Sequence, residues 1–318
     1  MALLLGSVIA CAHLPPAPER AIPSMLAREG IGGAVLAIGP IGGPVRLVAW
    51  GEAAPGQPMR VGDRFRLASL AKPLTAATAL ALVRLGKLRL DRPLPETANG
   101  ATLRQLLSHS GGWDRALTFD PIGDPVSAQR IGLADPDDCR VIANRMPAND
   151  FRPGERYAYS NIGYCRIGQA IERAARLDYA EAVARLILRP RRSGLAYLGL
   201  PSVTHPSRFS PNAWRALGPA GGWTGSALDY WRFAAGPVDP LVRFRPPFAV
   251  AGQSHYGLGW RIRPDGTLTH FGAIPGIFAL VVRTPTHAAV LLTNGRPFDD
   301  EATSEALIRS LTRAMRRP

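Results

Sequence analysis

A serine and a lysine three residues apart are the first residues in this chain that could do chemistry together. Ser69 and Lys72 lie in the tetrapeptide Ser-Leu-Ala-Lys, and Lys72 is one of only two lysines among the 38 basic residues. Arginine keeps its charge in proteins, whereas a lysine can lose its proton when it is desolvated or lies near other positive charge. Lys72 is therefore placed where a base could activate a serine nucleophile.

The residues that follow Ser69 predict a buried helix that would hold this pair on one face. Positions 72–90 are apolar at helical spacing, and Pro73 is tolerated only in a first turn, so the helix should begin close to Ser69. The positive end of the helix dipole would then favour negative charge developing near the serine. The alternative is a helix-capping serine followed by an incidental lysine, because serine is a favoured N-cap.

Two later segments carry further polar groups. Tyr159-Ser160-Asn161 follows a Pro-Gly turn and opens a helix predicted to run to about Arg176, whereas His270-Phe271-Gly272-Ala273 lies among short strand-like runs. Taken alone, the tyrosine would be a core aromatic, the asparagine a helix cap and the histidine a hydrogen-bonded structural residue.

Taken together, these segments resemble the serine β-lactamase and penicillin-binding-protein superfamily. The motifs that carry the resemblance are Ser69-x-x-Lys72, Tyr159-x-Asn161 and His270-x-Gly272. A tyrosine at the start of the second motif is similar to the class C branch, with its esterase, D-aminopeptidase and DD-peptidase relatives. Residues 106–113, 221–229 and 256–260 resemble further segments of that family, so that the likeness covers about residues 30–295.

The resemblance implies both a fold and a set of roles. The fold would be α+β and β-lactamase/transpeptidase-like, with an antiparallel sheet of about five strands flanked by terminal helices, and with a mainly helical insertion. Ser69 would be the acylated nucleophile, and Lys72 or Tyr159 would accept its proton, in an order that the sequence leaves open. Asn161 would hold a substrate amide or orient the lysine. The backbone N–H groups of Ser69 and Ala273 would form the oxyanion hole.

A lysine or tyrosine needs its pKa of about 10 lowered before it can act as a base near neutrality. We expect the mutual proximity of the Lys72 ammonium and the Tyr159 phenol to supply that shift.

His270 is the main departure from the lactamase pattern. Class C β-lactamases carry Lys-Thr-Gly at this place, and His-x-Gly resembles the esterase and D-aminopeptidase relatives. A permanent ammonium is thereby replaced with a group that is largely neutral at pH 7. We therefore expect a serine hydrolase that acts on an ester, D-amino-acid amide or cell-wall peptide through an acyl-enzyme. A weak β-lactamase and a catalytically silent penicillin-recognising protein are the alternatives.

The hydrophobic pattern indicates how the chain is organised. It predicts strands at residues 32–38, 44–50, 257–263, 267–271, 277–283 and 288–293, and a closing helix at about 299–315. Helices and Pro-rich loops dominate the region between the early and late strands. We expect a sheet subdomain of residues 26–86 and 211–318 and a helical subdomain of residues 87–210, within one catalytic domain of residues 26–318.

The first residues predict export. Residues 1–11 are apolar but too short to span a bilayer, and Val8-Ile9-Ala10-Cys11 resembles a bacterial lipobox, so Cys11 would be lipidated and anchor the protein to a membrane. Residues 1–25 would then be a signal and Pro-rich tether that direct the protein to the periplasm or cell envelope; a plain secreted form is the alternative. Cys139 and Cys165 flank the Tyr159 loop, where they would form a disulfide or remain unpaired and buried.

Other classes of function find little support in the sequence. The six histidines are scattered, without a zinc spacing, and we expect neither a metal nor an organic cofactor. His109 lies between two serines, but the family likeness places it in a structural loop. The net charge of +14 suggests nucleic-acid binding, yet the arginines are dispersed rather than clustered, so we expect no nucleic-acid partner. The expected partner is a small-molecule or peptide acyl substrate, bound by a monomer.

Overall fold

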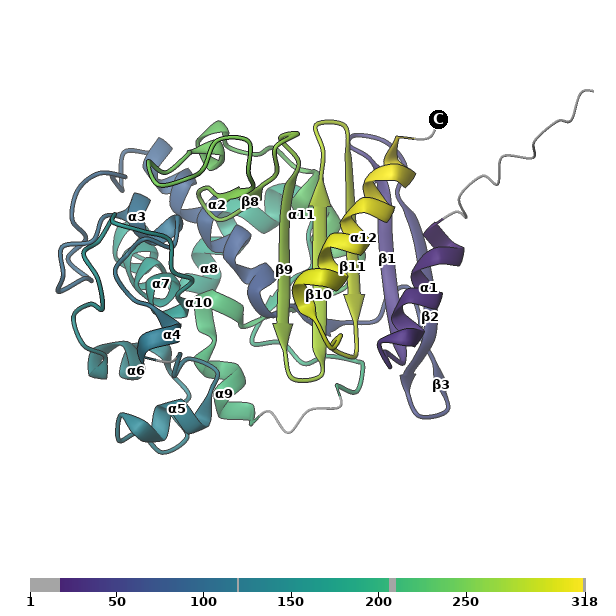
Figure 1. Cartoon of the computed structure of the whole chain (residues 1–318), viewed down its shortest axis with the longest axis horizontal. Helices are drawn as coiled ribbons and strands as arrows, with labels where there is room; N and C mark the ends of the chain where they lie inside the picture. Colours follow the sequence, from purple (N-terminus) through teal and green to yellow (C-terminus); the bar gives the residue numbers. More distant parts are fainter. Residues whose placement is uncertain (1–17, 119, 206–209, 317–318) are drawn as a thin grey trace, which may run out of the picture.

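The computed structural model describes residues 18–118, 120–205 and 210–316, and its centre is an antiparallel sheet built from both ends of the chain (Figure 1). The strand order is β3-β2-β1-β11-β10-β9-β8-β7. Its strands are β1 (Gly33–Pro40), β2 (Arg46–Ala54), β3 (Gln57–Pro58), β7 (His255–Tyr256), β8 (Arg261–Ile262), β9 (Leu268–Ile274), β10 (Ile277–Arg283) and β11 (His287–Thr293). The five long strands, β2-β1-β11-β10-β9, form the expected sheet, and three two-residue strands extend its edges.

Both faces of the sheet are covered, which explains why its central strands are apolar throughout. Alternate residues of β10 point to opposite faces, as strand geometry requires. Leu280 packs in a cluster with the terminal helices α1 (Pro18–Arg28) and α12 (Asp300–Met315), whereas Val281 packs in the main core on the other face. In Figure 1, α12 crosses in front of the sheet, with α1 beside it.

In the helical part, α2 (Ala71–Arg84) packs against α7 (Asn161–Ala175) and α10 (Gly218–Gly221). The other helical elements are α3 (Leu103–Leu107), α4 (Arg115–Thr118), α5 (Pro125–Arg130), α6 (Cys139–Arg145), α8 (Tyr179–Val183), α9 (Pro211–Ala216), α11 (Ala227–Ala235), the 3₁₀ turns η1 (Ala68–Leu70), η3 (Arg189–Arg191) and η4 (Pro240–Arg243), and the π-helical turn η2 (Ala184–Leu188). A small second sheet has the order β4 (Phe65–Arg66), β6 (Trp223–Gly225), β5 (Ala196–Tyr197).

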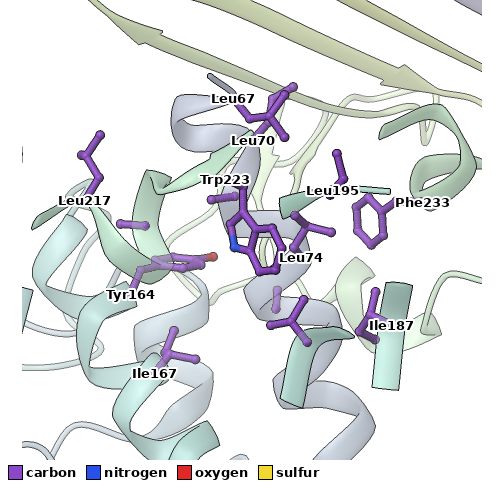
Figure 2. Packing of buried hydrophobic residues seen from close by; sticks show 14 of the residues in the cluster. Leu67, Leu70, Leu74, Tyr164, Ile167, Ile187, Leu195, Leu217, Trp223 and Phe233 are labelled. Carbon is purple, nitrogen blue, oxygen red and sulfur yellow. The ribbon is translucent and has the colours of Figure 1, made fainter. Parts of the chain in front are cut away.

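One hydrophobic core runs from the sheet into the helical part. Figure 2 shows the buried Trp223 indole lying between Leu70 and Leu74 of the α2 region and the surrounding helices. The same cluster includes Val35 of β1 and Ile167 of α7. Helix α2 belongs to the chain segment that was expected in the sheet subdomain, yet it packs mainly against helices of the other part. The division into subdomains at residues 86/87 and 210/211 stays a prediction.

Two expected elements end early or are interrupted in the structure. The helix predicted over positions 72–90 ends at Arg84, and Gly86 follows with a φ of 70°. The strand predicted at 257–263 is interrupted, because Gly259 has a φ of 85° and a Cβ there would collide with Ala76. Each interruption uses a left-handed conformation that favours glycine.

At the N-terminus, α1 begins at Pro18 within the range expected to be tether, and its Ile22 is fully buried. An amphipathic helix therefore docks on the sheet where an extended linker was expected. Cys11 and the expected lipobox lie outside the described residues. Within the described ranges, no helix combines the length and apolar character needed to cross a bilayer.

Candidate active site

Ser69 lies in the 3₁₀ turn Ala68–Leu70, here called the serine turn, which leads directly into α2. The preceding residue, Ala68, has a φ of 45°, a left-handed conformation that is strained for a residue with a side chain. Neither the serine turn nor α2 has a side-chain N-cap. The capping alternative for Ser69 is therefore wrong, and its hydroxyl is directed to other partners.

Lys72 lies one turn into the helix and is completely buried. In its ammonium form, Nζ donates hydrogen bonds to Ser69 Oγ at 3.0 Å, to Asn161 Oδ1 at 2.7 Å and to the Ala220 carbonyl oxygen at 2.9 Å. Burial holds the pKa of the Lys72 ammonium well below its ordinary value; nearby Asp120 acts in the opposite direction. The lysine is thus held beside the serine hydroxyl in an environment that favours its neutral form.

Tyr159 completes the contacts of the serine hydroxyl. Its phenol donates to Ser69 Oγ at 2.6 Å, while Nζ of Lys72 lies 4.7 Å from the ring centroid. Burial raises the pKa of Tyr159 above its ordinary value, even though the hydrogen bond to Ser69 opposes this. The expectation that proximity would lower both pKa values is therefore wrong for the phenol, and for Lys72 the main cause is burial. Near neutrality Tyr159 keeps its proton.

Asn161 is the first residue of α7, but it does not cap that helix. Ser160 is the N-cap, since its Oγ accepts from the Gly163 backbone N–H at 3.2 Å. The Asn161 amide instead bridges two ionisable groups: Oδ1 accepts from Lys72, and Nδ2 donates to Asp120 Oδ2 at 2.7 Å. Burial raises the pKa of the Asp120 carboxyl to about 6.

His270 faces the same site from β9 and is almost fully buried. Its Nδ1 lies 2.8 Å from the Phe271 carbonyl oxygen, which can only accept, so Nε2 accepts from the Tyr256 hydroxyl at 2.8 Å. Burial lowers the pKa of the His270 imidazole to about 3. The imidazole is therefore neutral at pH 7, as expected from its replacement of a lysine.

Gly272 and Ala273 bring β9 against the serine turn. A Cβ on Gly272 would lie 2.8 Å from the Ser69 backbone nitrogen and 2.6 Å from the Leu67 carbonyl oxygen, closer than side chains approach backbone atoms. Only glycine fits there without displacement. Ser69 and Ala273 line one cleft, as the oxyanion-hole expectation requires.

The cleft has a volume of about 630 Å³ and opens beside strand β9. It is lined by Ser69, Tyr159, Asn161 and His270, which come from segments far apart in the sequence. The lining also includes the ion pair of Arg261 with Glu301, and Glu301 comes from α12. The structure thus brings all three sequence motifs to one cleft, a common location for ligand sites.

Two groups that contact the Tyr159 ring were not assigned to the site from the sequence. Arg115 lies over the Tyr159 ring at 4.8 Å from its centroid. The buried His109, expected in a structural loop, lies 4.2 Å from the same ring and its Nδ1 accepts from the Ser160 backbone N–H at 3.1 Å. The histidine therefore supports the loop that carries Tyr159. The only feature of the sequence that drew attention to His109 was its position between two serines.

Cys139 and Cys165 are joined by a disulfide, with their Cα atoms 6.0 Å apart. The bond links α6 to α7, the helix that begins at Asn161. It therefore closes a loop of chain that contains Tyr159.

Solved structures share this fold over nearly the whole chain. The crystal structure of SurE with D-Leu is 28% identical, with a TM-score of 0.72, covering 93% of this chain and 74% of that one. D-amino acid amidase from Ochrobactrum anthropi SV3, complexed with L-phenylalanine amide, is 21% identical, with a TM-score of 0.72, and the match covers 93% and 97% of the two chains. The latter likeness shows the fold alone.

Curated relatives match over shorter stretches. A probable fimbrial assembly protein FimD of serogroup H1 from Dichelobacter nodosus is 32% identical over 207 residues, 57% of this chain and 50% of that protein. Esterase EstB from Burkholderia gladioli is 32% identical over 174 residues, 49% of this chain and 43% of that protein. The aligned part is thus half or less of each relative. The family model for beta-lactamase matches residues 19–313, and the chain therefore belongs to the β-lactamase family.

Proposed function

We infer that this member of a serine hydrolase family cleaves an ester or an amide through an acyl-enzyme formed on Ser69. The observation that carries the proposal is the position of the Ser69 hydroxyl between Lys72 Nζ at 3.0 Å and the Tyr159 hydroxyl at 2.6 Å. A serine hydroxyl is a weak nucleophile until a neighbouring base accepts its proton. The lowered pKa of Lys72 and the raised pKa of Tyr159 favour the lysine as that base.

In the acylation step, Ser69 Oγ forms a bond to the substrate carbonyl carbon and its proton passes to Lys72 Nζ. The carbonyl electron pair moves to the oxygen, where the N–H groups of Ser69 and Ala273 would donate to it. Collapse of this intermediate breaks the bond to the leaving group, which takes a proton relayed from Lys72 through Tyr159. Water then hydrolyses the acyl-enzyme with the same base. Loss of one oxyanion donor typically costs about 100-fold or more in kcat.

The neutral imidazole of His270 favours ester or amide substrates that carry no carboxylate for the enzyme to bind. A carboxylate on the substrate would gain little from a group whose pKa is lowered to about 3, because that group carries no charge at pH 7. This favours a hydrolase of the esterase or D-amino-acid amidase kind over an efficient β-lactamase. The names of the similar proteins, which include an esterase and a D-amino acid amidase, agree with that choice.

The Cys139–Cys165 disulfide supports our proposal that the protein is exported, since disulfides persist mainly in oxidising compartments such as the bacterial periplasm.

The test is hydrolysis of a short-chain p-nitrophenyl ester by the full chain and its variants. Ser69→Ala and Lys72→Ala should each lower kcat/KM by at least about 1000-fold, because either change removes part of a unit that acts together. Lys87→Ala is the matched control, since the only other lysine is exposed. Retained turnover in Ser69→Ala, with an unchanged melting temperature, would overturn the proposal.

A further inference from the structure

Asp120 is a partly buried acidic group at the candidate active-site cleft to which the proposed mechanism gives no role. It lies between α4 and α5 and lines the cleft. Its Oδ2 accepts from Asn161 Nδ2 at 2.7 Å, and its Oδ1 accepts from the Ile122 backbone N–H at 3.3 Å. Asp120, Asn161 and Lys72 therefore form a hydrogen-bonded chain that ends at the nucleophile.

The amide in the middle of this chain has two chemically different ends. An ionised carboxylate can only accept hydrogen bonds, so it requires the Asn161 NH₂ group to face it. The amide oxygen then faces Lys72, where it accepts one hydrogen from Nζ, and the Ala220 carbonyl oxygen accepts another. A neutral lysine has two N–H hydrogens and one lone pair. With both hydrogens engaged, the lone pair is left pointing toward Ser69 Oγ.

A neutral group at position 120 would remove this constraint. A protonated Asp120 could donate to the Asn161 amide oxygen, and the amide could then turn its NH₂ group toward Lys72. The neutral lysine would accept that hydrogen bond with the lone pair that it needs for the Ser69 proton. Correct orientation of the amide therefore depends on the negative charge of Asp120 whenever Lys72 is in its reactive, neutral form.

The surroundings of Asp120 bring the pKa of its carboxyl closer to neutrality. Burial disfavours the ionised carboxylate, whereas Lys72 from α2 and Arg115 from α4 favour it, and the net effect raises its pKa to about 6. Asp120 in turn raises the proton affinity of Lys72 and of the Tyr159 phenol. Loss of the carboxylate charge therefore lowers the pKa of Lys72 still further.

We propose that Asp120 is a positioning residue whose ionised carboxylate fixes the orientation of the Asn161 amide and thereby directs the lone pair of neutral Lys72 at Ser69. The proposal rests on the proposed function, because it assumes that Lys72 is the base for Ser69. It adds Asp120, an acidic residue outside the three sequence motifs, to the residues that activity requires.

The experiment measures how fast Ser69 reacts with a fluorophosphonate between pH 5 and 9, followed by intact mass of the full chain. In this reaction Ser69 Oγ bonds to phosphorus, fluoride leaves with the electron pair, and the serine proton passes to the base. Asp120→Asn keeps the shape of the side chain and removes its charge. Asp91→Asn is the matched control, because it removes the same charge from an exposed carboxylate paired with Arg104.

Asp120→Asn should lower the plateau rate at high pH by about tenfold, the scale on which a hydrogen bond to a charged group changes an equilibrium. The acid limb of its profile should also move to lower pH, because the group titrating near 6 is gone and the pKa of Lys72 falls. Asp91→Asn should change neither quantity. A plateau rate and midpoint equal to those of the parent protein would overturn the proposal.

A double-mutant cycle separates positioning from general damage to the fold. Because Asp120 acts through the amide, Asp120→Asn should not lower the plateau rate further once Asn161→Ala is present; additive losses would count against the proposal. If thermal melting shows that Asp120→Asn is unfolded, Asp120→Ala takes its place in the cycle. Labelling of Ser69→Ala at the parental rate would instead refute the proposed function, so the two failures are distinguishable.

Discussion

Gly272 leaves no space for a side chain between β9 and the serine turn, so Gly272→Ala tests how closely that strand must approach. The added methyl carbon would lie 2.6 Å from the Leu67 carbonyl oxygen, 2.8 Å from the Ser69 nitrogen and 3.1 Å from the Leu70 nitrogen. All three are backbone atoms, which cannot rotate away as a flexible side chain would. Either β9 or the serine turn must therefore move.

The size of the effect follows from these distances. An ordinary van der Waals contact for a methyl carbon lies near 3.5–4.0 Å, so relief of the clash needs a displacement of roughly 1 Å. Misplacement of reacting groups by about 1 Å can cost about 100-fold in rate, and overpacking typically destabilises a protein by about 1–3 kcal/mol. Gly272→Ala should therefore lower kcat/KM by at least about 100-fold and also lower the melting temperature by several degrees.

The assay is hydrolysis of a p-nitrophenyl ester, with thermal unfolding of the same samples. Gly62→Ala is the control, because a Cβ there meets no atom within 4 Å and that glycine is exposed. The control should match the parent protein in both measurements. A Gly272→Ala protein with activity within about twofold of the parent would refute the claim that close contact between β9 and the serine turn is needed.

Three further predictions concern other parts of the site. Tyr159→Phe removes the hydroxyl that donates to Ser69 and should lower kcat by about 100-fold at unchanged stability, as measured by ester hydrolysis and thermal melting; equal rates would exclude a proton relay through the phenol. Cys139→Ser with Cys165→Ser should lower the free energy of unfolding by about 3 kcal/mol in denaturant titrations, since the disulfide closes a loop with a sequence separation of 26; no change would show that the disulfide does not constrain the unfolded chain. Asp120→Asn should raise the melting temperature above that of the parent protein at pH 8 but not below pH 4. The pKa of Asp120 is about 6 in the folded state and 3.8 ordinarily, so the parent protein loses stability as pH rises through 6, whereas the variant does not. Equal melting temperatures of parent and variant at both pH values would contradict the burial of that charge.

Local patterns predicted the elements that carry the three motifs. The apolar run of α2 and its early proline placed the helix next to Ser69, and β10 was predicted with the bounds that the structure has. Periodicity and turn chemistry are local signals, and in these segments the tertiary fold agrees with them. By contrast, the Pro-rich start concealed α1, because its stability comes from packing Ile22 and Leu26 against a sheet built from distant strands.

The place of Asp120 in the candidate site could not be predicted from the sequence. Its contact with Asn161 joins residues 41 positions apart, and the loop that carries it has no periodicity. The raised pKa of Tyr159 was missed for a related reason: it comes mainly from burial, which only the assembled fold determines. Motifs therefore indicated which groups meet at the cleft, whereas the proton affinities of those groups depend on side chains that no motif contains.

The pairing of β1 with β11 also has a consequence for how the enzyme is made. Ala34 lies opposite Thr293, so the sheet cannot close until the ribosome has synthesised residue 293. Contacts this far apart in sequence make folding slow, because a long loop must be ordered before they form. The serine turn likewise lacks its neighbour β9 until residues 268–274 have been synthesised. A chain that stops before residue 293 should therefore lack both the closed sheet and the assembled cleft.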